Sequence, residues 1–185
     1  MKVLNVHERE LSVPQEQVGE LIDSLSSRED SLWPRHSWPR MEFDRPLQVG
    51  ATGGHGPIRY FVENYTPGRS IRFRFTGPRG FNGHHRFELF ETTGEVCILR
   101  HTLEMDAIGP AVISWPLVFR PLHNALIEDS LALAQANLGQ QPLVHKWSSW
   151  VKLLRWLVSK GQARAQVTPS TIVNRNAPQA PRPLP

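Results

Sequence analysis

Between residues 41 and 107 the chain alternates apolar and polar side chains with a period of two, which constrains it to antiparallel strands with one buried face. Residues 66–69 carry proline in second place and glycine in third, which is typical of a tight turn. A two-residue loop there pairs apolar side chains on one face: Val62 with Phe73 and Tyr60 with Phe75. On the other face it places Glu63 opposite Arg72.

A second hairpin is predicted at Thr92-Thr93-Gly94, because a three-residue loop ending in glycine is a common turn with a bulge. This loop predicts three pairs on the apolar face: Leu89 with Cys97, Phe87 with Leu99, and His85 with His101. The opposite face alternates charges and is expected to be solvated: Arg86, Glu88, Arg100 and Glu104. We therefore expect His85 and His101 to be neighbours on the buried face.

A long helix is predicted over residues 111–138. Pro116 and Pro121 shape its first turns, and Gly139 is placed to end it. Its broad apolar stripe is expected to be buried on the sheet. With a strand over residues 2–11 and a short helix after it, the pattern predicts an α+β fold.

The order of these elements resembles the SRPBCC superfamily, the START-like group that includes polyketide cyclases, dehydrases and lipid-transfer domains. The stretches that carry the resemblance are VHERELSVPQEQVGELI, GPIRYFVENYTPGRSIRFRFTGPRGFNGHHRFELFE, LRHTLEM and WPLVFRPLHNALIEDSLALAQANLG. They cover residues 1–139. The resemblance implies the helix-grip fold, a curved antiparallel sheet wrapped around a long C-terminal helix, with an apolar cavity between the two.

The predicted registers indicate which side chains would line such a cavity and bind a hydrophobic small molecule or lipid. They are Tyr60, Val62, Phe73, Phe75, His85, Phe87, Leu99, His101, Leu103 and Met105. A mostly apolar pocket with a few polar groups is the usual form of a small-molecule site. The alternative is that these side chains fill a solid core.

His85 and His101 are the candidate catalytic residues. A buried imidazole can anchor a ligand's carbonyl or hydroxyl, or act as a general acid or base in a cyclase or dehydratase reaction. The alternative is a hydrogen-bonded pair without a ligand, since no orienting carboxylate is evident. A metal site would need a third ligand, for which His123 is the obvious candidate, and we expect neither a metal nor a cofactor. Cys97 is expected in the core.

Charge is distributed unevenly along the chain. Residues 1–139 carry 14 Lys and Arg against 17 Asp and Glu, whereas residues 140–185 carry 7 Lys and Arg and no acid. Residues 143–160 are predicted to form a basic amphipathic helix that contacts an anionic membrane surface, packs on the domain, or pairs with a second copy. The residues expected at a membrane or partner are Trp147, Trp150, Lys152, Leu154, Arg155 and Leu157. Residues 161–185 are expected to be a disordered, proline-rich tail.

These features leave three functions open: a carrier or sensor of a hydrophobic molecule, an enzyme that uses the histidine pair, and a membrane-associated or protein-binding accessory module. The acids among the sheet's arginines argue against nucleic-acid binding. No apolar run suits a membrane-spanning helix or a signal peptide, so a cytoplasmic protein is expected, with a peripheral position at the membrane as an alternative.

Overall fold

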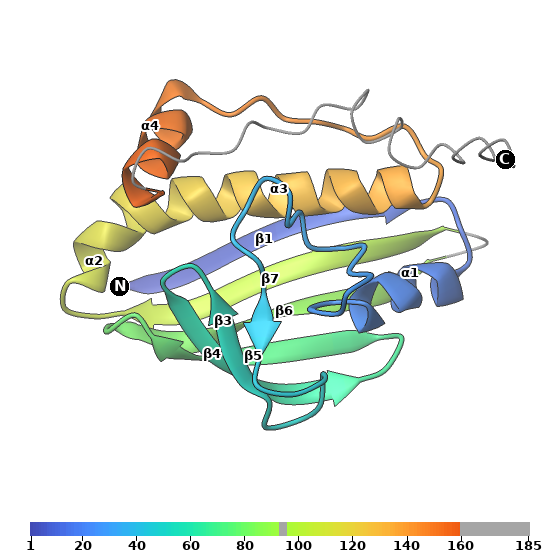
Figure 1. Ribbon diagram of the computed structural model, residues 1–185, viewed down its shortest axis with the longest axis horizontal. Coiled ribbons are helices and arrows are strands. Elements are labelled where there is room, and N and C mark those ends of the chain that lie inside the picture. Colours follow the sequence, from blue (N-terminus) through green and yellow to red (C-terminus); the bar gives the residue numbers. More distant parts are fainter. Residues whose placement is uncertain (93–95, 160–185) are drawn as a thin grey trace, which may run out of the picture.

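The computed structural model describes residues 1–92 and 96–159. Its strands form one antiparallel sheet in the order β1-β7-β6-β5-β4-β3-β2 (Figure 1). The bounds are β1 Lys2–Leu11, β2 Glu42–Phe43, β3 Thr52–His55, β4 Ile58–Thr66, β5 Ser70–Gly77, β6 Phe81–Glu91 and β7 Cys97–Ala107. The N-terminal strand β1 thus lies at an edge of the sheet, beside the last strand.

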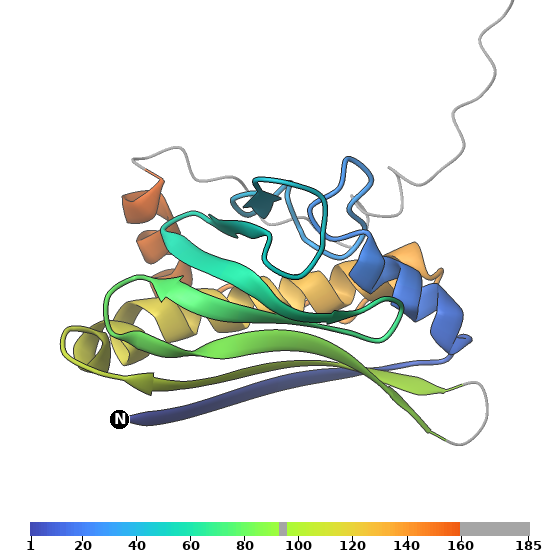
Figure 2. The ribbon, with the colours of Figure 1, turned by 90° about the horizontal axis from the view of Figure 1, so that it is seen from below.

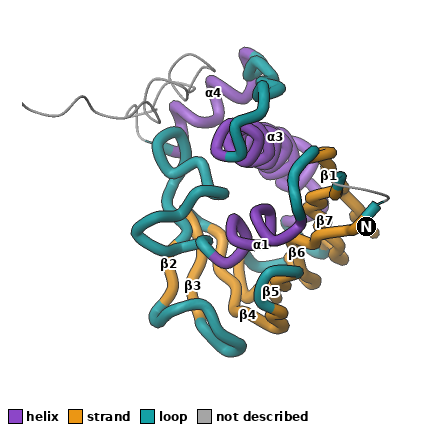
Figure 3. Tube along the Cα trace, turned by 90° about the vertical axis from the view of Figure 1, so that its right-hand side faces the viewer, coloured by secondary structure: helices purple, strands orange, loops and turns teal. Residues whose placement is uncertain are grey.

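The helices are α1 Gln15–Asp23, α2 Ala111–Ser114, the π-helical turn η1 Trp115–Phe119, α3 Arg120–Asn137 and α4 Ser149–Val158. Figure 2 shows the sheet curving around α3. In Figure 3, which views α3 end-on, α1 and α3 lie on the same concave side. The predicted helix-grip fold is confirmed, and its core lies between the sheet and these helices.

The β4–β5 hairpin follows the predicted register near its open end. Tyr60 pairs with Phe75 and Val62 pairs with Phe73. Beyond Val62 a bulge places Asn64, not Glu63, opposite Arg72, so that predicted direct pair is wrong. Glu63 nevertheless accepts a hydrogen bond from Arg74 at 2.7 Å, so the charged face forms as expected.

The β6–β7 hairpin is shifted by two residues from the predicted register. The observed pairs are Leu89 with Leu99, Phe87 with His101, and His85 with Leu103. The predicted direct pairs are therefore wrong, and Thr93 and Gly94 of the predicted turn lie outside the described residues. Because a shift of two keeps every side chain on its own face, His85 and His101 still point inward and meet diagonally across the strands.

Elements α2, η1 and α3 follow one another without a break and form the predicted long helix. Pro116 and Pro121 lack the N–H that an α-helix would use, and the π-helical turn lies around them. The carbonyl of Leu117, four residues before Pro121, instead accepts a hydrogen bond from the indole of Trp150 in α4, at 2.8 Å. The prolines thus leave an acceptor that helps to hold α4 in place.

The C-terminal helix is shorter than predicted and lies against the domain. It begins at Ser149 rather than 143, and residues 141–148 run irregularly along α3 (Figure 1). The hydroxyl of Ser148 accepts a hydrogen bond from the Val151 N–H and caps the helix. No helix among the described residues is long and apolar enough to cross a membrane.

The buried face of α4 includes a cation between two aromatic rings. The guanidinium of Arg155 lies 4.1 Å from the ring centroid of Trp38 and 4.0 Å from that of Trp147. Leu154 is buried beside it. Trp147, Leu154 and Arg155, which are expected to contact a membrane or partner, are buried in this chain's own interior, in line with the alternative that this segment packs on the domain.

Two leucines of α4 test this orientation. Leu154 is 5% exposed, and Leu157, one turn later, is 55% exposed. We expect Leu154→Ala to lower the free energy of unfolding by about 2–4 kcal/mol, because it empties a packed site. Leu157→Ala is the matched control and should change it by less than about 0.5 kcal/mol. Equal effects in urea titrations of the two variants would contradict this packing.

Candidate functional site

Four histidines from different elements point into the space under α3. His55 comes from β3, His85 from β6, His101 from β7 and His123 from α3. The Nδ1 of His85 lies 3.3 Å from the Nε2 of His101, within hydrogen-bond distance. The ring centroids of His101 and His123 are 5.0 Å apart. Sheet and helix therefore meet at a cluster of imidazoles.

Aromatic rings surround the centre of this cluster. The ring of His85 stacks on Phe73 and on Phe75, with centroids 4.9 and 5.1 Å away. Tyr60 meets the same imidazole edge-on at 4.8 Å. Phe87 packs edge-on against His101 at 4.7 Å. The imidazoles thus lie in apolar surroundings and away from solvent.

Several ring nitrogens in the cluster lack a hydrogen-bond partner among the described residues. Nε2 of His85 and Nδ1 of His101 are buried and unpartnered, although each ring's other nitrogen takes part in the bond between them. Neither nitrogen of His123 makes a well-formed hydrogen bond. A buried polar atom without a partner costs roughly 1–3 kcal/mol, so these atoms point to a polar group that the described residues do not supply.

The surroundings keep the four imidazoles neutral. Burial lowers the pKa of His85 and His101 well below the ordinary value of 6.5, and neighbouring histidines add to this effect. Burial likewise lowers the pKa of His55 and His123 to about 3, in His123 against a small opposing effect of the Asn124 side chain. Near neutral pH each ring therefore carries one N–H donor and one nitrogen acceptor.

His55 forms the outer end of the cluster, nearest β2. Its Nδ1 lies 2.9 Å from the hydroxyl of Tyr60, and its ring packs on Trp33 with centroids 4.7 Å apart. Burial raises the pKa of Tyr60 well above its ordinary value, so the phenol stays protonated. This pair satisfies its own hydrogen bond, unlike the His85–His101 pair.

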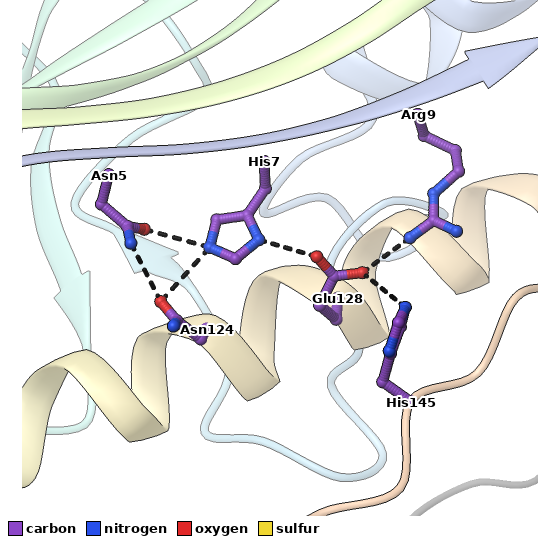
Figure 4. A network of polar contacts seen from close by, with 6 residues as sticks. All are labelled: Asn5, His7, Arg9, Asn124, Glu128 and His145. Atoms are coloured by element: carbon purple, nitrogen blue, oxygen red, sulfur yellow. Dashed lines mark hydrogen bonds and ion pairs between the residues drawn. The ribbon is translucent and has the colours of Figure 1, made fainter.

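A second polar network joins β1 to α3 and was missed in the sequence analysis (Figure 4). The carboxylate of Glu128 lies 2.7 Å from Nδ1 of His7 and accepts a hydrogen bond from Arg9 at 2.6 Å. His145 approaches the same carboxylate at 3.4 Å. The hydrogen bond with His7, followed by the electrostatic effects of His7, Arg9 and His145, lowers the pKa of Glu128 against the opposing effect of burial. Nε2 of His7 contacts the amide oxygens of Asn5 and Asn124.

The signal for this network lies in the alternation of β1. Asn5, His7 and Arg9 occupy every second position and face α3, whereas Leu4 and Val6 are exposed on the outer face. A strand with apolar residues on both faces did not indicate which side was inward. The ring of His7 lies 6.0 Å from that of His123, so the network borders the histidine cluster.

The ten residues predicted to line a cavity are all buried on the inner face. They are Tyr60, Val62, Phe73, Phe75, His85, Phe87, Leu99, His101, Leu103 and Met105. Of the residues predicted to meet a membrane or partner, Trp150, Lys152 and Leu157 are exposed. Cys97 is a buried free thiol with a raised pKa, caused by burial.

Chemically, the site can donate and accept hydrogen bonds but has no charged partner at its centre. The carboxylate of Glu128 contacts His7 and not His85 or His101. In residues 1–92 and 96–159 no group of three or more side chains could hold a metal ion, and His123 does not complete one with the pair. The arrangement suits recognition of a neutral polar group on an otherwise apolar molecule.

No family model and no curated protein sequence matches this chain. Solved structures match its fold. A solution NMR structure from Thermobifida fusca is 16% identical with a TM-score of 0.57, over 77% of this chain and 99% of its own. Norcoclaurine synthase from Thalictrum flavum, in complex with dopamine and hydroxybenzaldehyde, is 12% identical with a TM-score of 0.56, over 77% and 90%.

CalU16 from Micromonospora echinospora is 11% identical with a TM-score of 0.53, over 93% of this chain and 97% of its own. Matches at sequence identities this low show a shared fold and do not show a shared activity. They agree with the SRPBCC resemblance at that level. The chain therefore has the helix-grip fold, with a buried histidine cluster where the sheet grips its long helix.

Proposed function

We propose that this protein binds a small, largely apolar molecule between the sheet and α3, as a carrier or sensor. The observation that carries the proposal is the pair of unpartnered nitrogens, Nε2 of His85 and Nδ1 of His101, buried among aromatic rings. One offers a donor and the other an acceptor when both rings are neutral and linked by one hydrogen bond. A ligand hydroxyl could donate to the acceptor nitrogen or accept from the N–H, and a ligand carbonyl could accept from the N–H.

The fold supports the same proposal. The helix-grip neighbour norcoclaurine synthase holds dopamine and hydroxybenzaldehyde, which are small aromatic molecules with hydroxyl groups. In the present chain the aromatic side chains of β4, β5 and β6 would contact the apolar part of such a molecule. The ligand class we propose is therefore a lipid, isoprenoid or polyketide-like compound with at least one hydroxyl or carbonyl group.

Binding is favoured over catalysis by the protonation state of the pair. A general acid or base works best when its pKa lies near the working pH. Burial lowers the pKa values of His85 and His101 far from neutrality, and no carboxylate orients either ring within the described residues. A cyclase or dehydratase that uses this pair remains the alternative function, and product formation from the bound molecule would identify it.

Native mass spectrometry of the protein purified from its own host tests the ligand. We expect an additional bound mass that is released on denaturation. The double variant His85→Phe/His101→Leu should lower its occupancy at least about tenfold, because two hydrogen bonds are lost. His84→Phe, on the opposite face of β6, is the matched control and should keep the ligand. Two absences together would refute the proposal: no compound bound to the purified protein, and no saturable binding of anilinonaphthalene sulfonate to the stripped, refolded protein.

The buried histidines also predict how stability depends on pH. Their folded pKa values lie below that of an unfolded imidazole, so the unfolded state binds more protons as the pH falls below 6.5. Stability should therefore be complete above pH 6.5 and decline below it, by up to roughly 1 kcal/mol per pH unit for each histidine. Urea titrations should show a shallower decline for His101→Leu than for wild type. A flat profile down to about pH 5 would contradict buried, neutral imidazoles.

A further inference from the structure

A patch of large apolar side chains remains exposed where α4 crosses the start of the long helix. Each of its members is between 45% and 67% exposed. They are Ile113 and Leu117 from α2 and η1, and Trp150, Leu153, Trp156 and Leu157 from α4. Monomeric proteins seldom leave apolar groups gathered in this way unless the surface has a role. We call this surface the α4 patch.

Contacts between the two elements make the patch continuous. The indole of Trp150 donates to the carbonyl of Leu117 and fixes α4 against η1. Ile113 lies about one helical turn before Leu117, and Figure 1 shows α4 beside this end of the long helix. The opposite face of α4, with Val151 and Leu154, is buried. The exposed side is therefore a second apolar face, set in position by the packing of the first.

The segments that carry the patch expose cations. Lys152 is exposed on α4, Lys146 just before α4, and Arg120 at the start of α3. Between residues 107 and 159 the sequence contains only two carboxylates, Glu128 and Asp129. Glu128 is bound to β1 and His145, and the Asp129 carboxylate accepts hydrogen bonds from the indoles of Trp38 and Trp147. Neither acid offsets the exposed cations.

We propose that the α4 patch docks on an anionic membrane surface. Tryptophan and leucine side chains would enter the boundary between headgroups and acyl chains, which suits the amphipathic indole ring. Lys146, Lys152 and Arg120 would remain at the headgroup level and meet anionic phosphates. This proposal does not depend on the ligand under α3.

Charge also favours a membrane surface over a second copy of the chain as the partner of the α4 patch. A symmetric dimer across the patch would bring Lys152 and Arg120 of one copy towards the same cations of the other. An anionic lipid surface has the opposite sign and favours the approach. Residues 160–185 carry four further cations and no acid in the sequence, which adds to the attraction.

Vesicle co-sedimentation of the full chain tests the proposal. The protein should bind phosphatidylcholine vesicles that contain phosphatidylglycerol, bind pure phosphatidylcholine at least about tenfold more weakly, and dissociate as NaCl is raised. Leu153→Ser/Trp156→Ser should weaken binding at least about tenfold with little change in melting temperature. Lys152→Glu should weaken it by more than about fivefold. Leu4→Ser/Val6→Ser, on the exposed face of β1, is the matched control and should bind as wild type does.

Three results would overturn the proposal. The first is that the wild-type chain does not bind anionic vesicles at low salt. The second is that the Leu153→Ser/Trp156→Ser variant binds as well as wild type, which would assign any attraction to residues outside the patch. The third is that sedimentation velocity shows a wild-type dimer that the same variant converts to a monomer, which would assign the patch to a second copy. Binding lost in the patch variants and kept in the β1 control, with a monomer throughout, would support it.

Discussion

The arrangement of α3 depends on directional polar contacts, among which the carboxylate of Glu128 joins three segments at once. One face of α3 is held on the sheet by apolar packing, which has no direction and does not fix the helix along its axis. Glu128 supplies that direction, because it binds His7 and Arg9 of the edge strand and also His145 of the segment that follows the helix. Three segments distant in the sequence therefore meet at one half-buried anion, whose charge is balanced by its partners.

The buried polar groups of the interior differ in whether they have hydrogen-bond partners. The His55–Tyr60 pair and the carboxylate of Glu128 have hydrogen-bond partners. Nε and Nη1 of Arg9 beside Glu128 have none among the described residues, and neither do Nε2 of His85 and Nδ1 of His101. From these rings a run of aromatic side chains leads towards the π-helical turn, since Phe75 packs on Phe81, and Phe81 packs on residues of η1. The proposed ligand site and the proposed docking patch thus lie on the two sides of the same helical turn.

The alternation of the strands was enough to predict the inward face of the sheet, and the family resemblance implied the helix-grip fold. Some features, however, have no signal in a single sequence. A slip of two residues preserves the alternation, so the β6–β7 pattern could not distinguish the pair His85–His101 from the pair His85–Leu103. Apolar residues of α4 lie on several sides of the helix. Its pattern therefore could not show that Arg155 is buried between two indoles while Trp156 is exposed. The role of His7 depends on Glu128, which is distant in the sequence.

The central claim is that His85 and His101 are neutral and that their free nitrogens are satisfied by a bound molecule. Long-range ¹⁵N–¹H correlation spectra of the imidazoles report both the protonation state and the tautomer of each ring. For protein as purified from its host at neutral pH, both rings should be neutral, each with one protonated nitrogen. Their shifts should change when the protein is denatured, extracted and refolded without the ligand. Imidazolium shifts, or identical spectra before and after extraction, would contradict the account.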